Sequence, residues 1–217
     1  MTVPHLLFGR MLEFNLLPSR TLHHSHYAAF ESPELVRVVQ AQAGWRAAWH
    51  RQWSSHILRT LNIGIVLHTR YPELALGLLS PQALSRLARR VGVVLSGQSV
   101  RQTILGEKVR ALQAALGVDL MNFARREGRR YEMDLPQWEI VEHGAGSLHE
   151  LETLGYRTLL ESVSQAPSEV VRRVELKLPL GIQDSDSPLS AVPAWRLCLA
   201  VLKDMDSTWC SFFPARC

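Results

Sequence analysis

Long apolar runs and a framework of paired cysteines are absent from this 217-residue sequence. Apolar stretches such as Ile63–Leu67 and Val91–Leu95 fall far short of the roughly 18 consecutive apolar residues of a membrane span, so we expect no membrane insertion. No basic region precedes an apolar stretch at the start, which argues against a secretory signal. The cysteines, Cys198, Cys210 and Cys217, are odd in number and crowded near the end, unlike a disulfide framework. These absences predict a cytoplasmic protein.

Lysine is also scarce: three of the 24 basic residues are lysines and the rest are arginines. Guanidinium groups bind carboxylates in a bidentate manner and suit interfaces, but a GC-rich genome produces the same bias without any function. Both interpretations stay open at this point. Hydrophobic residues make up 47% of the chain, enough to bury one good core or two small ones, and we predict a single domain over residues 1–217.

Charge is distributed unevenly although the net charge is only +4. Residues 84–130 carry nine Arg and one Lys against three acids, a net +7, whereas residues 131–169 carry eight acids against one Arg, a net −7. Segments of opposite sign either pair with each other inside the fold or form a two-signed surface that meets charged partners.

The periodicity of apolar residues is mostly helical. Ser80 and Pro81 are typical of a helix start, and the apolar residues of 84–95 recur at three- and four-residue spacing. A second run over 105–123 keeps this period through Gly117, which weakens the prediction of an unbroken helix there. A last helix includes Cys198 on its apolar face, where we expect a small buried side chain.

Three tryptophans four residues apart, Trp45, Trp49 and Trp53, form one stripe of another predicted helix, which Ile57 continues. This stripe indicates a core face, with a docking ridge for a partner as the alternative. Two segments alternate instead, Leu12–Leu16 and Val174–Leu178, and predict a small two-stranded β-ribbon on the helical body. The expected fold is therefore mainly α, a globular multi-helix domain with at most this small ribbon.

No motif for catalysis, cofactor binding or metal binding is present. His23, His24 and His26 have no Cys or carboxylate at ligand spacing, so we predict a surface histidine loop rather than a zinc site. We find no nucleophile elbow, zinc-protease motif or phosphate-binding loop. The acid pairs Glu139/Glu142 and Glu150/Glu152 are explained by solvated helix faces. The protein is therefore not expected to be an enzyme.

The small residues Ala88 and Gly92 suggest a helix-turn-helix, but the residues that follow them do not fit this motif. The next two core positions of such a motif fall on Gln98 and Arg101, and burying an unpaired arginine costs several kcal/mol. A helical nucleic-acid-binding regulator that uses the basic segment 84–130 is kept as the alternative function.

The densest basic cluster is Arg125, Arg126, Arg129 and Arg130, interrupted by Glu127 and Gly128. One interpretation is a helix C-terminus, where cations favour the negative end of the helix dipole. The other is a contact with an acidic protein surface, which makes these four residues the candidate partner-binding site.

Several segments resemble the SctK/YscK family of type III secretion proteins. Residues 90–106 are similar to the family's L-G-x-x-L-x-G-x-x-[IV]-R-x-x-[IL] stretch, and Val-Glu-Leu-Lys-Leu-Pro-Leu at 174–180 is similar to its L-x-L-[KR]-L-P-L segment. Leu12–Arg20 resembles the family's opening, although Pro18 stands further from the phenylalanine here. Cys198 and Lys203 fall in a similar C-terminal helix.

This resemblance implies a non-enzymatic adaptor of the injectisome's cytosolic sorting platform, peripheral at the cytosolic face of the base. Proteins of this family link the cytoplasmic domain of the inner-membrane ring protein SctD to SctQ pods, which connect through SctL to the ATPase SctN. The partners implied are an SctD-like protein, an SctQ-like protein and an SctL-like ATPase regulator. No cofactor, small-molecule substrate or nucleic acid is implied.

Overall fold

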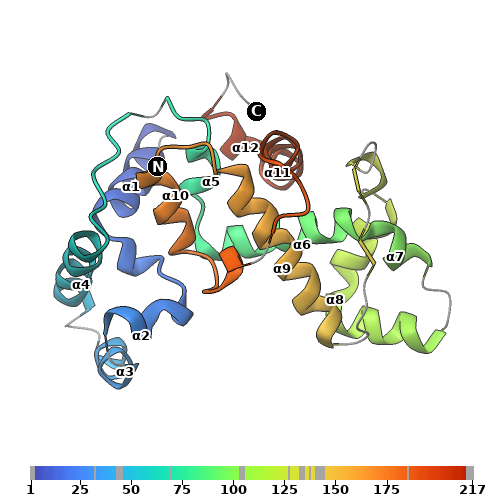
Figure 1. The fold of residues 1–217 in the computed structure, drawn as a ribbon, viewed down its shortest axis with the longest axis horizontal. Helices are drawn as coiled ribbons and strands as arrows, with labels where there is room; N and C mark the ends of the chain where they lie inside the picture. The colour runs from blue at the N-terminus through green and yellow to red at the C-terminus, as the bar shows by residue number, and fades with distance from the viewer. Residues whose placement is uncertain are drawn as a thin grey trace. The chain divides into compact units, whose positions relative to one another are not determined.

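In a computed structural model of the protein, the described part of the chain consists of helices joined by turns (Figure 1). No strand occurs in it, and the predicted mainly α-helical class is confirmed. The described residues are 3–31, 33–42, 46–68, 70–102, 106–126, 128–131, 135–136, 138–139, 145–184 and 186–213.

Contacts between residues divide the chain into two compact units, which we describe separately. Unit 1 comprises residues 1–81, 165–181 and 212–216, and unit 2 comprises residues 82–164, 182–211 and 217. The single domain expected over residues 1–217 stays a prediction.

Unit 1 is built from six α-helices and two short 3₁₀-helices among its described residues. They are α1 (Val3–Leu16), η1 (Pro18–Arg20), η2 (His24–His26), α2 (Tyr27–Phe30), α3 (Pro33–Ala41), α4 (Arg46–Thr60), α5 (Leu74–Gly77) and α10 (Ser168–Glu175). Trp53 and Ile57 of α4 are buried in its core with Val36 of α3, and Trp49 packs against the same cluster. The predicted core stripe is thus confirmed for these residues of α4, whereas Trp45 lies outside the described residues.

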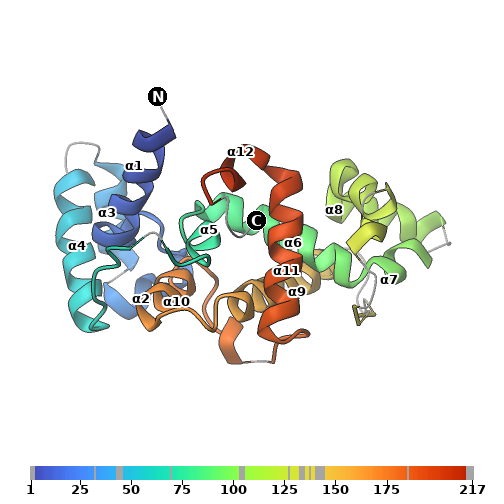
Figure 2. The same ribbon diagram turned by 90° about the horizontal axis from the view of Figure 1, so that it is seen from above.

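Unit 2 is also helical throughout its described residues. Its elements are α6 (Pro81–Leu95), α7 (Gly97–Gln102), α8 (Gly106–Arg126), η3 (Gly128–Tyr131), α9 (Ala145–Ser162), η4 (Ile182–Asp184), α11 (Ala191–Met205) and α12 (Ser207–Cys210). The helix expected from Pro81 is confirmed. The expected break in the following helix is confirmed too, since Gly117 interrupts α8 with φ 78° and ψ 164°. Figure 2 shows α11 crossing α9, its most extensive packing partner. Cys198 of α11 is fully buried, as expected.

Two glycines allow α6 and α9 to cross at very short range in unit 2. A Cβ atom on Gly92 of α6 would stand 2.0 Å from the carbonyl oxygen of Leu151, and one on Gly155 of α9 would stand 1.9 Å from that of Ala88. Real Cβ atoms essentially never approach closer than 3.0 Å. The small residues Ala88 and Gly92, which suggested a helix-turn-helix in the sequence, therefore lie where the α9 backbone approaches α6.

The predicted β-ribbon is wrong, because neither of its segments is a strand: the first is helical, and the second passes from the end of a helix into turns. Leu12–Leu16 is the last part of α1, and Val174 belongs to α10, which ends at Glu175. Burial follows tertiary packing rather than alternation: Phe14 and Asn15 are neighbours and are both buried, while Leu12 and Leu16 are exposed. After α10, the chain continues in turns that bury consecutive residues, a pattern that a half-buried strand does not give.

Two cations are buried around Phe14 in unit 1. The Lys177 ammonium donates to the carbonyl oxygens of Gly77 at 2.6 Å and Leu79 at 3.0 Å. Arg173 Nε donates to the carbonyl oxygen of Phe14 at 2.9 Å, and both cations lie 5.3 Å from the centre of the Phe14 ring. Burial lowers the pKa of Lys177 to about 7 and that of Arg173 to about 10. The two side chains thus tie the segment around α10 to α1 and to the turn after α5.

The histidine segment is not a surface loop, contrary to the prediction. It forms η2, and His26 is 7% exposed with its Nε2 atom 2.9 Å from the carbonyl oxygen of Leu178. The backbone N–H of His23 donates to the carbonyl oxygen of Leu176, and that of Leu180 donates to the hydroxyl of Ser25. These contacts form because the turns at 176–180 leave backbone groups that η2 can satisfy.

Candidate partner-binding site

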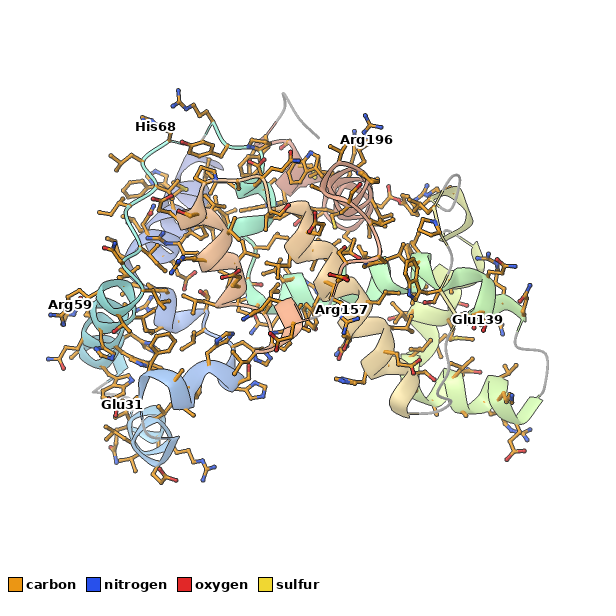
Figure 3. The ribbon with its side chains drawn as sticks, in the orientation of Figure 1. Glu31, Arg59, His68, Glu139, Arg157 and Arg196 are labelled. Carbon is orange, nitrogen blue, oxygen red and sulfur yellow. The ribbon has the colours of Figure 1, made fainter. Side chains whose placement is uncertain are left out.

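The basic cluster lies at the end of α8 and in η3. Arg125 is exposed and makes no ion pair with another described residue. The side chains of Arg126 and Arg129 lie outside the part of the chain that the structure describes. Exposure alone does not single out the cluster, because Arg59 of α4 and Arg196 of α11 are exposed too (Figure 3).

Arg130 differs from Arg125 because it is engaged within unit 2. Its guanidinium forms a salt bridge with the carboxylate of Asp204 on α11, and the hydroxyl of Tyr131 donates to the same carboxylate. The Arg130 guanidinium also lies 5.1 Å from the centre of the Tyr131 ring, within the range of a cation–π contact. Arg130 therefore helps to hold η3 against α11.

The ring of Tyr131 continues this arrangement toward α6. It lies 6.4 Å from the ring of Phe123 on α8, and the Arg90 guanidinium of α6 lies 5.0 Å from the centre of the Phe123 ring. The two neighbouring aromatic rings thus have a guanidinium group at each end, from Arg90 of α6 to Arg130 of η3. Each contact of this kind contributes about 0.5–1 kcal/mol where it is exposed to solvent.

Two further arginines of the basic segment have partners within unit 2. Arg89 Nε of α6 donates to Glu152 Oε1 of α9 at 2.5 Å, so the basic and acidic segments pair directly at this point. Arg101 donates to the carbonyl oxygen of Ala124 at 3.5 Å, near the end of α8. Internal pairing therefore accounts for part of the +7 charge of residues 84–130. Of the two cluster side chains that the structure describes, Arg130 has an ion-pair partner within unit 2 and Arg125 has none among the described residues.

Sequence reasoning found the arginines but missed their partners. Asp204 is 74 residues from Arg130, and no local pattern connects the two. Of the acid pair Glu139/Glu142, Glu142 lies outside the described residues. Within the described part, Glu150 and Glu152 are half-buried on α9, and Glu152 is the partner of Arg89.

A family model covers almost the whole chain. The model described as YOP proteins translocation protein K (YscK) matches residues 10–213. This protein belongs to the YscK family. No curated protein sequence matches it.

One solved structure shares the fold of this YscK family member. It is described as the cytoplasmic domain of the type III secretion sorting platform protein PscK from P. aeruginosa. The two chains are 21% identical, with a TM-score of 0.57, and the match covers 91% of this chain and 95% of the other. The resemblance to the SctK/YscK family seen in the sequence is therefore confirmed.

The segments that resembled the YscK family in the sequence make contacts that hold the fold together. Residues 174–180 hold the buried Lys177 and the carbonyl groups that η2 contacts, and residues 90–106 include Gly92 of the α6–α9 crossing. These features explain why particular residue types are needed there, and they assign no chemistry to the segments.

We next consider the metal-binding and membrane-spanning features of this YscK family member, for its described residues. Within them, no group of three or more His, Cys, Asp or Glu side chains is placed to hold a metal ion. His23 is held by Ser25, whose backbone N–H donates to His23 Nδ1 at 3.3 Å. Burial beside His24 and His26 lowers the pKa of His23 to about 4. Among the described helices, none is both long and apolar enough to span a membrane.

Proposed function

We propose that this protein is a non-enzymatic adaptor in the cytoplasmic sorting platform of a type III secretion system. It links an SctD-like inner-membrane ring protein to SctQ-like pods, with an SctL-like ATPase regulator as a further neighbour, at the cytosolic face of the injectisome base. The family match over residues 10–213 carries the proposal. The fold shared with the cytoplasmic domain of PscK supports it.

In this proposal the basic cluster meets an acidic surface of one platform partner. Arg125 supplies an exposed guanidinium for that contact, together with Arg126 and Arg129, while Arg130 anchors η3 to Asp204. Charge complementarity of this kind steers the encounter and fixes the register of docking more than it adds affinity. The contact should therefore weaken as the ionic strength rises.

The test is capture of purified partners by the full chain. The SctQ-like protein and the cytoplasmic domain of the SctD-like protein of the same bacterium are each incubated with the immobilised wild type. They are also incubated with the triple variant Arg125→Glu, Arg126→Glu, Arg129→Glu. We expect the triple variant to capture one partner about tenfold less well, as loss of 1–2 kcal/mol of charge pairing would give.

A control variant and circular dichroism separate a loss of docking from a loss of folding. Arg110→Glu makes the same charge change at an exposed position of the same helix, before the interruption at Gly117, and should leave capture unchanged. Arg130→Glu is kept out of the triple variant because it would place a second carboxylate beside Asp204. Circular dichroism should show the same helical content for all the variants.

Each outcome bears on a different part of the proposal. If the wild type captures neither partner, the adaptor function is refuted. If it captures both and the triple variant does so equally well, the adaptor function stands and the arginine cluster is not its docking site. Recovery of DNA and RNA polymerase from a secretion-competent cell would instead support the nucleic-acid-binding alternative.

A further inference from the structure

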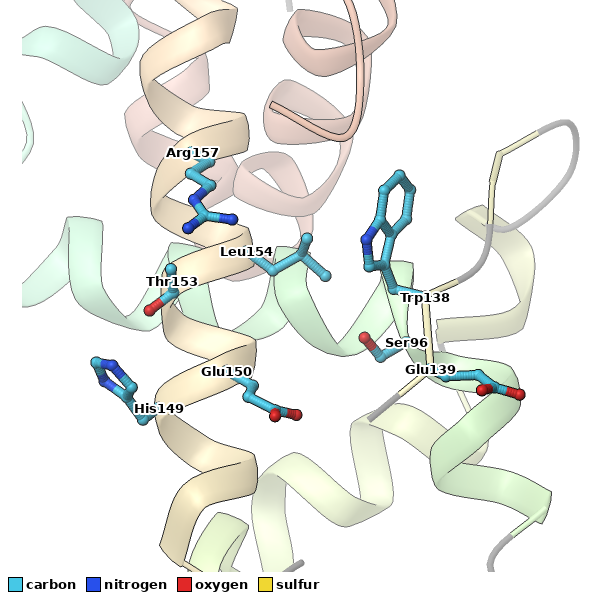
Figure 4. A pocket seen from close by; sticks show the side chains of 8 residues that line it. All are labelled: Ser96, Trp138, Glu139, His149, Glu150, Thr153, Leu154 and Arg157. Carbon is cyan, nitrogen blue, oxygen red and sulfur yellow. The ribbon is translucent and has the colours of Figure 1, made fainter. Parts of the chain in front are cut away.

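A cavity in unit 2 lies apart from the basic cluster, since neither Arg125 nor Arg130 lines it. Its volume is about 290 Å³, close to the lower end of the range for small-molecule sites, so its size suits a single side chain. One wall is a face of α9 that includes Thr153, Leu154 and Arg157. The indole ring of Trp138, which is 38% exposed, stands opposite Leu154 (Figure 4).

Arg157 carries a buried hydrogen-bond donor that lacks an acceptor. Its Nε atom is shielded from solvent, and no described residue accepts a hydrogen bond from it. The guanidinium also makes no ion pair with a described carboxylate. A buried donor without a partner carries a desolvation cost, which is larger for a charged group. Because the side chain lines the cavity and is only half-buried, an acceptor that enters the cavity can relieve this cost.

Helix geometry brings a second polar group close to this guanidinium. A side chain on an α-helix leans toward the helix N-terminus, so it lies over the residue four positions earlier. Thr153 is four residues before Arg157 on α9, and Figure 4 shows the guanidinium of Arg157 directed along the helix toward Thr153. Both side chains line the cavity, so the Thr153 hydroxyl can donate a hydrogen bond to an acceptor that also meets the guanidinium.

Neither carboxylate of the cavity wall is the acceptor that Arg157 lacks. Glu150 lies seven residues before Arg157 on α9, roughly 10 Å along the helix axis, and has an interaction of its own within the chain. Glu139 is exposed, and its carboxylate is directed away from α9 (Figure 4). The two carboxylates reduce the attraction of an anion into the cavity, but they leave the donors of Arg157 and Thr153 unfilled.

We propose that this cavity binds an acidic side chain presented by a partner protein. The carboxylate accepts hydrogen bonds from the guanidinium of Arg157 and the hydroxyl of Thr153, and its aliphatic stem packs on the apolar wall formed by Leu154 and Trp138. A carboxylate suits the guanidinium better than a neutral carbonyl because charge-assisted hydrogen bonds are about twice as strong. A partner protein is the expected source, because an exposed tryptophan beside an arginine is typical of interface hot spots. The contact is separate from the docking of Arg125, which involves other residues.

The test is a titration of the ¹⁵N-labelled full chain at constant ionic strength, followed by NMR at the Nε–H group of Arg157. This resonance is assigned by its disappearance in Arg157→Met. N-acetyl-glutamate methylamide should shift it downfield and saturably, with a dissociation constant in the low millimolar range, as expected for a ligand of about 14 non-hydrogen atoms. The glutamine analogue has the same shape without the charge, and acetate has the carboxylate without the rest of the residue. We expect both to bind at least about tenfold more weakly.

Variants assign the binding to the cavity, with the backbone amide of residue 153 as the reporter. Arg157→Met keeps the length of the stem but removes the guanidinium, and it should abolish binding of the glutamate probe. Thr153→Val should weaken it about tenfold, the factor expected for a lost hydrogen bond to a charged group. Arg196→Met makes the same change as Arg157→Met at an exposed position of α11, outside the cavity lining, and should bind as the wild type does.

Arg157→Met also tests the missing acceptor in the absence of any probe. Removal of a buried donor that has no partner should leave the urea midpoint of the variant equal to or above that of Arg196→Met. A clearly lower midpoint would show that the fold already supplies an acceptor for Arg157, which would contradict the proposal. This measurement does not depend on the choice of probe.

Three results of the titration would overturn the inference. They are equal binding of the glutamate and glutamine probes, equal binding of acetate and the glutamate probe, and no shift with any probe up to 50 mM, roughly ten times the dissociation constant expected for so small a ligand. The second result would indicate an unselective anion site rather than a site for a side chain. Full affinity of Arg157→Met for the glutamate probe would also contradict the proposal. None of these results depends on capture of sorting-platform proteins, so the proposed function can stand or fall separately.

Discussion

The crossing of α6 and α9 predicts that Gly155→Ala destabilises unit 2 severely. The new Cβ would lie 1.9 Å from the carbonyl oxygen of Ala88, and it would have to reach at least 3.0 Å to be tolerated. Backbone atoms of a helix cannot rotate away as a flexible side chain can. The two helices must therefore separate locally by about 1 Å.

The expected cost follows from that separation. A radial gap of 0.5–1 Å forfeits about a quarter to a half of the dispersion energy of each contact that it opens. Leu84, Leu87 and Val91 of α6 and Leu151 of α9 are nearly fully buried, so many contacts are weakened together. We estimate a loss of about 3 kcal/mol in the free energy of unfolding, at the upper end for overpacked cores.

Urea unfolding followed by circular dichroism measures this loss, with Gly9→Ala as the matched control. Gly9 lies inside α1, and a Cβ there would meet nothing within 4 Å. The control should be more stable than the wild type by about 0.5–1 kcal/mol, because alanine favours the helix. Gly92→Ala should cost about as much as Gly155→Ala, and the double variant less than the sum, because one separation accommodates both Cβ atoms. A wild-type midpoint for Gly155→Ala would refute the close crossing.

Three further predictions concern ionisable groups. Burial lowers the pKa of Lys177 from 10.5 to about 7, so above pH 7 the unfolded chain binds more protons than the folded chain, and folding becomes more favourable as the pH rises. In urea unfolding, the stability difference between the wild type and Lys177→Met should therefore grow from pH 7 to pH 9. A difference that stays constant would contradict this. The pKa of His23 is lowered from 6.5 to about 4, so the folded protein loses stability as the pH falls through this range. His23→Asn keeps an acceptor for the backbone N–H of Ser25 but does not titrate, so its melting temperature should fall less than that of the wild type between pH 6.5 and pH 4. Arg130→Glu should lower the unfolding free energy by about 1 kcal/mol, and adding Asp204→Arg should recover part of it; no recovery would mean that the pair contributes nothing.

Local signals in the sequence were sufficient for several helices. Pro81 at the start of α6 and the interruption of α8 at Gly117 were both predicted, because each depends on the backbone preference of a single residue. The buried face of α4 was predicted from spacing alone. Such features need no knowledge of what packs against them.

Features that depend on distant partners were not predictable in the same way. The alternation at 174–178 resembled a strand, but Lys177 in that segment is buried because the carbonyl groups of Gly77 and Leu79 accept its hydrogen bonds. His26 is buried for a similar reason, through Leu178. A pattern of apolar and polar residues does not record which polar residues have found a partner.

The small residues of α6 show why one pattern supports two interpretations. Ala88 and Gly92 are spaced as in a helix-turn-helix, where small residues let a second helix approach, and the same spacing permits the close crossing with α9. The sequence argued against the first interpretation because Gln98 and Arg101 suit no core. In the structure Gln98 is exposed and Arg101 donates to Ala124.

The uneven charge distribution of the sequence is explained by identifying the partner of each arginine in the structure. Arg89 pairs with Glu152 and Arg130 with Asp204, so part of the +7 segment is neutralised within unit 2. A GC-rich genome would account for arginine in place of lysine at any surface position, but it does not account for stacking on Phe123 or Tyr131, for which the planar guanidinium is better suited. The informative quantity for docking is therefore not the sum over the segment but the charge left without an internal partner. Among the described side chains of the basic cluster, that charge is at Arg125, where reversal tests docking with the least effect on the fold.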